Sequence, residues 1–168
     1  MAQVQQPSFV VRDYEERDAN TVKEMMRALI KLRGLKTRFI MLNAAYDAYF
    51  APYLKGVAKG GDNVVKVAED KGKIVGYAIA SKSSEPAPAE HTKVAELVDM
   101  YVAESHRGIG VASALLQGLE DWARAKKLTA VVVNAFPQLE EELTALRSLG
   151  FHDWRVKLIH VIEKDRHA

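Results

Sequence analysis

The stretch from Val94 to Trp122 constrains the fold more than any other part of the chain. It opens with an apolar run that has the length and the β-branched or aromatic content of a buried strand: Ala95, Leu97, Val98, Met100, Tyr101 and Val102. After the turn at 104–110, apolar residues recur at three- and four-residue steps and predict a helix: Ala112, Leu115, Leu116, Leu119, Trp122 and Ala123. A strand, a short turn and a helix direct free backbone N–H groups and the positive end of a helix dipole toward one point. Two glycines in the turn let a phosphate approach closely, so the stretch predicts a phosphate site.

The spacing of the glycines in this turn excludes two common phosphate loops. A Walker loop requires Lys and then Ser or Thr directly after its last glycine, but Gly110 is followed by Val111. A dinucleotide-binding loop requires a third glycine three residues after the second, where this chain has Ser113. The residues that remain, Arg107-Gly108-Ile109-Gly110-Val111-Ala112, form an R-x-x-G-x-A motif.

This motif resembles the coenzyme-A pyrophosphate loop of the GNAT superfamily of N-acetyltransferases. Residues 99–104 before the loop and Leu149-Gly150-Phe151 after it also resemble that family's usual context. The ordered set of strand, loop, helix, second strand and late Gly-Phe is more specific than the loop alone. The resemblance covers roughly the C-terminal half of the chain.

Size and composition bound the class of protein. At 168 residues we expect one domain over 1–168, with polar tails at 1–7 and 164–168. The chain has no cysteine, which excludes disulfides, thiolate metal sites and a cysteine nucleophile. A net charge of +2 gives no sign of the broad basic surface that binds nucleic acid. The five histidines do not have the spacing of metal ligands. Without a membrane-spanning apolar run or a signal peptide, we expect a cytoplasmic protein. Without cysteine or suitably spaced histidines, we expect no metal site.

The N-terminal half predicts two helices and a hairpin. Residues 18–34 predict a helix with Asp18 as its cap, an end or a bend at Gly34 and a buried stripe of Val22, Met25, Met26, Leu29 and Ile30. A second helical stretch has a kink or a start near Pro52 and carries Phe39, Leu42, Tyr46, Phe50 and Tyr53. We interpret these aromatic side chains as part of the core. The resemblance places this region beside the acceptor groove, so the alternative that they surround a substrate stays open. Runs 64–68 and 74–80 predict strands joined by a turn at 69–72, and 83–90 predict a surface loop.

The C-terminal part predicts a strand at 128–133, a helix and a final strand at 156–162. The helix begins near Pro137 and ends at Gly150, with a stripe of Leu139, Leu143, Leu146 and Leu149. These elements predict a mixed α/β (α+β) layered structure with six to seven strands and about four helices. The resemblance implies more: a three-layer GNAT-like fold with a mostly antiparallel sheet and an opening beside the loop for acetyl-CoA.

The resemblance also implies a function. The chain would be an acetyl-CoA-dependent N-acetyltransferase acting on a primary amine, which is either a protein lysine or N-terminus or a small amine. A homodimer stays open, and the small net charge argues against nucleic acid. The cofactor contacts implied are backbone N–H groups of the loop, the Ser113 hydroxyl and the following set: Met100, Tyr101, Val102, Arg107, Gly108, Ile109, Gly110, Val111, Ala112 and Asn134.

Two carboxylates of the predicted strand are candidates for the base that removes the proton of the amine. Strict alternation would place Glu96 on one face with Val98, Met100 and Val102, and Asp99 on the other face with Leu97 and Tyr101. By resemblance, Glu96 matches a catalytic glutamate of histone-type members, and Asp99 matches an aspartate that is more often structural. Whether Glu96 is base or scaffold stays open.

The proton donor to the leaving thiolate departs from the family pattern. Many members have a tyrosine four residues before the glycine of the late Gly-Phe, where this chain has Leu146. Tyr101 is the nearest candidate in the sequence. The same departure supports an alternative function, a non-catalytic acyl-CoA-binding regulatory module. If the chain is an enzyme, the lack of cysteine predicts direct attack in a ternary complex.

Overall fold

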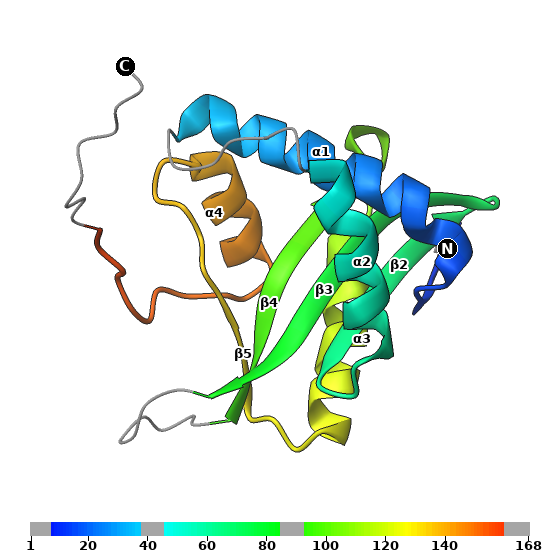
Figure 1. Cartoon of the computed structure of the whole chain (residues 1–168). Coiled ribbons are helices and arrows are strands. Elements are labelled where there is room, and N and C mark those ends of the chain that lie inside the picture. Colours follow the sequence, from blue (N-terminus) through cyan, green and yellow to red (C-terminus); the bar gives the residue numbers. More distant parts are fainter. Residues whose placement is uncertain (1–7, 38–45, 85–92, 160–168) are drawn as a thin grey trace, which may run out of the picture.

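The computed structural model describes residues 8–37, 46–84 and 93–159, and these residues form one five-stranded sheet in the order β1-β2-β3-β4-β5 (Figure 1). The strands are β1 (Phe9–Asp13), β2 (Asn63–Asp70), β3 (Lys73–Ser84), β4 (Lys93–Val102) and β5 (Ala130–Val133). The first four are antiparallel neighbours, and β5 runs parallel to β4. The mixed, mostly antiparallel sheet is therefore confirmed, with fewer strands than the six to seven expected.

Among the described residues, four helices cover the two faces of the sheet and complete three layers. They are α1 (Ala19–Lys36), α2 (Tyr46–Lys59), α3 (Val111–Ala125) and α4 (Glu140–Ser148), with short 3-10 turns at Glu16–Asp18 and Glu104–His106. On one face of the sheet, α1 and α2 pack Val22, Met26, Phe50, Leu54 and Val57 against Val65, Val67, Tyr77 and Ile79. On the other face, α3 packs Val111, Leu115 and Leu119 against Ala78, Ala80 and Leu97, together with Leu146 of α4 (Figure 1). Among the described residues, no helix has the length and apolar character needed to cross a membrane.

Strand β4 contains a β-bulge. Ile79 of β3 lies opposite Asp99, and the next residue of β3, Ala80, lies opposite Leu97, so Val98 has no partner across the ladder. One extra residue on one strand reverses the side-chain alternation beyond it, because successive residues of a strand point to opposite faces. The two halves of β4 are therefore out of phase with each other.

The bulge overturns the predicted sharing of faces. Leu97 packs in the cluster under α3, and so does Met100, three residues further on. Tyr101 packs in the cluster under α1 and α2, and Asp99 contacts Tyr77 of that same cluster. Because its neighbours in sequence point toward α3, Glu96 is left on the same face as Asp99. The prediction that Glu96 shares a face with Met100, and Asp99 with Leu97, is wrong.

Strands β4 and β5 are paired over only part of the length of β4. Their register begins at Val94 and Ala130 and ends at Leu97 and Val133. From the bulge onward, β4 is paired with β3 alone among the described residues. The chain that continues from β5 leads instead to α4, beside the C-terminal half of β4 in Figure 1. Beyond Leu97 and Val133 the two strands are therefore not paired with each other.

Several local predictions about helices need correction. Of the end and the bend predicted at Gly34, the end is wrong, because α1 continues to Lys36. Of the kink and the helix start predicted near Pro52, the start is wrong, because Pro52 lies inside α2. Asp18 does not cap α1 with its side chain, which instead accepts the backbone N–H of Glu15 at 2.8 Å and pairs with Arg12 at 2.7 Å. Burial raises the pKa of Asp18. The hydrogen bonds from Arg12 and Glu15 outweigh burial, so that pKa is lowered overall.

The remaining predictions concern turns and the C-terminal segment. The β2–β3 hairpin closes through two residues, Lys71 and Gly72, with φ of 49° and 78°, rather than through a turn over 69–72. Gly150 ends α4 with φ of 93°, as predicted. The final strand expected at 156–162 is not formed over 156–159, where Leu158 is 89% exposed. The other residues of that strand, both predicted tails, the predicted loop residues 85–90, Phe39 and Leu42 lie outside the described residues.

Candidate active site

The loop between β4 and α3 has the backbone geometry of an anion site. Gly108 and Gly110 have φ of 76° and 91°, in the left-handed region that favours glycine. A Cβ built on either glycine would meet nothing within 4 Å, so both residues border open space. Gly110 occupies the N-cap position of α3, where no side chain accepts the first N–H groups of the helix. These features fit a pyrophosphate that is bound by backbone N–H groups.

Two side chains of this loop contact other parts of the protein. His106 Nε2 lies 3.2 Å from Asp70 Oδ2 at the end of β2, and His106 Nδ1 lies 2.9 Å from Ser105 Oγ. The hydrogen bond to His106 lowers the pKa of Asp70. Arg107 Nε donates to the carbonyl of Val102 at 3.1 Å. The loop is therefore fixed to the β2–β3 hairpin on one side and to β4 on the other.

Glu96 and Asn134 form a hydrogen bond where β4 and β5 separate. Asn134 Nδ2 donates to Glu96 Oε1 at 2.7 Å. Asn134 directly follows the last residue of β5, and Glu96 pairs with Val132 in the last part of the β4–β5 ladder. Sequence reasoning assigned the two residues separate roles, base and cofactor contact, and did not place them together. One carboxylate oxygen of Glu96 is oriented by this amide, and the other has no contact of this kind among the described residues.

Asp99 lies inside the protein with both carboxylate oxygens engaged. The residue is 9% exposed. Tyr77 Oη donates to Oδ2 at 2.7 Å, and Arg33 Nη1 donates to Oδ1 at 3.0 Å. Burial raises the pKa of Asp99, and the charge of Arg33 opposes that rise. These contacts favour a structural role for Asp99 over the role of catalytic base.

Arg33 is the principal residue that sequence reasoning missed. Besides Asp99, its Nε and Nη2 donate to the two carboxylate oxygens of Glu142 in α4, at 3.2 and 3.1 Å. Burial lowers the pKa of Arg33, but the charges of Asp99 and Glu142 outweigh it and raise that pKa overall. A signal for Arg33 was present, because it stands four residues after Leu29, at the next step of the buried stripe of α1.

The comparisons with known proteins give the family. Residues 23–151 match the family model described as the acetyltransferase (GNAT) family, and this span is more than half of the chain. The chain belongs to the GNAT family. No curated protein matches the chain.

Several solved structures have the same fold as this chain. A tetramutant of a Bacillus halodurans protein is 16% identical, with a TM-score of 0.78 over 91% of this chain and 99% of that one. Aminoglycoside N-acetyltransferase AAC(6')-Iy in complex with CoA is 18% identical, with a TM-score of 0.76 over 95% and 99%. A predicted acetyltransferase of Clostridium acetobutylicum with acetyl-CoA is 17% identical, with a TM-score of 0.75 over 95% and 99%. At these identities the likeness is one of fold.

In this GNAT chain, Leu146 occupies the position of the family's usual tyrosine and is part of the core. Leu146 is 9% exposed and packs with the residues of β3, β4 and α3 on that face. Tyr101, the other candidate for the proton donor, is half-buried, and the guanidinium of Arg107 lies 5.8 Å from the centre of its ring. Met100 and Val102 pack toward α3. The structure thus brings Tyr101 close to the loop and leaves no hydroxyl at position 146.

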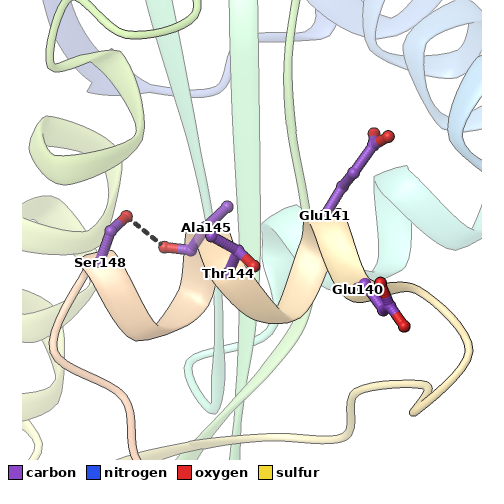
Figure 2. Close-up of a pocket in the computed structure, with 5 residues that line it drawn as sticks. All are labelled: Glu140, Glu141, Thr144, Ala145 and Ser148. Carbon is purple, nitrogen blue, oxygen red and sulfur yellow. Dashed lines mark hydrogen bonds between the residues drawn. The ribbon is translucent and has the colours of Figure 1, made fainter.

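A hollow of about 480 Å³ lies along α4, and none of the predicted site residues lines it (Figure 2). It is lined by Glu140, Glu141, Thr144, Ala145 and Ser148, which are all exposed. Ser148 Oγ donates to the carbonyl of Ala145 at 2.7 Å, so this hydroxyl is used within the helix. Among the described residues of this GNAT chain, no group of three His, Asp or Glu side chains could hold a metal ion.

Proposed function

We propose that this GNAT chain is an N-acetyltransferase that transfers the acetyl group of acetyl-CoA to a primary amine. The observation that carries the proposal is the loop before α3, where two left-handed glycines border open space at an uncapped helix start. Membership of an acetyltransferase family supports it. Structural relatives include the complexes with CoA and acetyl-CoA and a glucosamine-6-phosphate N-acetyltransferase from Arabidopsis thaliana.

The residues proposed to hold the cofactor lie along the end of β4 and the start of α3. When bound, acetyl-CoA supplies an acetyl group activated as a thioester. The first turn of α3 and the loop bind the pyrophosphate through backbone N–H groups, with the exposed Ser113 hydroxyl as a further donor. The full set is Met100, Tyr101, Val102, Arg107, Gly108, Ile109, Gly110, Val111, Ala112, Ser113 and Asn134.

Glu96 is proposed as the base. The amide of Asn134 holds Oε1, so Oε2 remains to accept a proton from the amine directly or through water. Tyr101 is the proposed donor to the leaving thiolate, because it is the tyrosine beside the loop. Asp99 serves the site indirectly through its bonds to Arg33 and Tyr77.

Kinetic order provides a test of the mechanism. A double-displacement reaction needs a covalent acetyl-enzyme, most readily on a thiolate, and the chain has no cysteine. We expect direct attack in a ternary complex, so double-reciprocal plots at several fixed amine concentrations should intersect. Parallel lines, or an acetylated enzyme isolated without an acceptor, would contradict this mechanism.

A second candidate function is a non-catalytic acyl-CoA-binding module, and one observation favours it. Leu146 is buried where many members of the family have a tyrosine that can donate a proton. The two functions differ in whether acetyl-CoA is consumed when an amine is present. Only an enzyme should release free CoA thiol in proportion to the amine acetylated.

The deciding experiment is an acceptor screen with purified protein and acetyl-CoA. Aminoglycosides, glucosamine 6-phosphate, a lysine peptide and a peptide with a free N-terminus cover small and macromolecular amines. Mass spectrometry should detect a product 42 Da heavier for at least one class. Binding of acetyl-CoA without any acetylated product would support the binding module instead.

A further inference from the structure

Two side-chain links join β4 to the segment after β5 at and beyond the point where the two strands stop pairing. The first is the hydrogen bond between Asn134 and Glu96, at the point of separation. The second lies further along and is made by Arg33, which reaches β4 through Asp99 and α4 through Glu142. No β-ladder joins the two sides there among the described residues, so side chains must set their separation.

The geometry around Arg33 is that of a fixed link. Its guanidinium donates two roughly parallel hydrogen bonds to Glu142, at 3.2 and 3.1 Å, and a third to Asp99 at 3.0 Å. The side chain of Arg33 is 16% exposed, so water screens these bonds only weakly. Tyr77 holds the other oxygen of Asp99, which extends the network to β3. In Figure 1 the C-terminal end of α1 lies over α4 and the end of β4, which is where this link must act.

We propose that Arg33 is a positioning residue for acetyl transfer, because it fixes α4 relative to the C-terminal half of β4. The inference rests on the proposed function, since acetyl transfer needs the amine and the thioester held in alignment. A displacement of about 1 Å can cost about 10²-fold in rate when reacting groups lose alignment. The loop before α3 is fixed by other residues, His106 and Arg107, so binding of the pyrophosphate should not depend on the bonds between Arg33 and Glu142.

Glu142→Gln is the sharpest kinetic test. The amide keeps one oxygen that can accept from Arg33 but loses the charge and the second acceptor, while Arg33 keeps its bond to Asp99. We expect kcat/KM for the acceptor to fall about 10- to 100-fold, with the Kd for acetyl-CoA changed less than twofold. The control is Glu141→Gln, an identical change at the neighbouring exposed residue, which should leave both values unchanged. If the two variants behave alike, Arg33 has no positioning role.

Arg33→Lys provides a second variant that keeps the buried positive charge. A lysine ammonium cannot present the planar fork, so it can satisfy Asp99 or Glu142 but not both in the present geometry. We expect the same split, with a lower kcat/KM for the acceptor and an unchanged Kd for acetyl-CoA. Loss of acetyl-CoA binding in folded Arg33→Lys protein would show a general structural role and overturn the proposal.

A spin-label measurement tests the link without catalysis. Because the chain has no cysteine, Gln117 of α3 and Thr144 of α4 can each be replaced by a labelled cysteine without first removing a native one. The distance distribution should broaden in Glu142→Gln and stay narrow in Glu141→Gln. An unchanged distribution, or a broadened one with normal transfer, would overturn the proposal. If the unaltered chain acetylates no amine, the proposed function fails and the role in transfer fails with it, but this measurement still decides whether Arg33 holds α4.

Discussion

Gly110→Glu is expected to abolish acetyl-CoA binding while the protein stays folded. The new side chain would enter the open space beside the loop, because a Cβ at this position meets nothing within 4 Å. It would bring a negative charge to the place where backbone N–H groups should meet a pyrophosphate, and it would repel that anion. Isothermal titration calorimetry should show no binding where the unaltered protein binds. Unchanged affinity would remove the basis for the proposed function.

Backbone strain must be separated from charge in this experiment. Gly110 has φ of 91°, which an L-residue adopts at a cost of roughly 1–3 kcal/mol. Gly110→Ala carries the same strain without the charge and should retain measurable affinity. Gly72→Glu adds the same side chain at a left-handed glycine of the β2–β3 turn, also in open space, and should bind acetyl-CoA normally. Circular dichroism melts of all three variants would show comparable, modest losses of stability.

Glu96→Gln is expected to lower kcat by about 10²–10⁴-fold with little change in acetyl-CoA affinity. The amide keeps the shape of the side chain but cannot take the proton of the attacking amine. A lysine-like amine has a pKa near ~10.4, so only about one part in 10³ is deprotonated at neutral pH. The loss should therefore shrink as pH rises, because more of the amine arrives as the free base. Rates for both proteins across pH 7 to 10 would measure this trend.

A control for Glu96 must remove an acid without touching the base. Glu104→Gln changes an exposed glutamate in the turn before the loop and should leave kcat unchanged. Near-normal turnover of Glu96→Gln at neutral pH would show that Glu96 is scaffold. Bulk water would then be the remaining acceptor for the proton, since both carboxylate oxygens of the buried Asp99 already accept hydrogen bonds.

The part of the fold that follows local rules could be predicted from the sequence. The helix after the loop keeps one apolar stripe, and Leu115 and Leu119 of that stripe are fully buried. The glycines of the loop were recognised because a left-handed backbone strongly favours that residue. The hairpin was also recognised, although its turn is shorter than predicted because Lys71 adopts a left-handed conformation beside Gly72.

The contacts that depend on tertiary structure could not be predicted. The apolar run of β4 is too uniform to show where its alternation reverses, so nothing in the sequence marks Val98 as unpaired. The approach of Arg33 to Glu142 joins residues 109 positions apart, and no local pattern encodes such a contact. Gly34 stays within α1 although glycine weakens helices, so the local preference of this residue did not decide where the helix ends.

The unpaired Val98 marks the position at which β4 can change its length without exchanging its two faces. Leu97 and Asp99 lie opposite consecutive residues of β3, so removing Val98 would close the bulge and leave both side chains in their present layers. Met100 would stay under α3, and Tyr101 would stay under α1 and α2. Removing a residue on either side of the bulge would instead turn every later side chain of the strand to the opposite layer, because successive residues of a strand point to opposite faces.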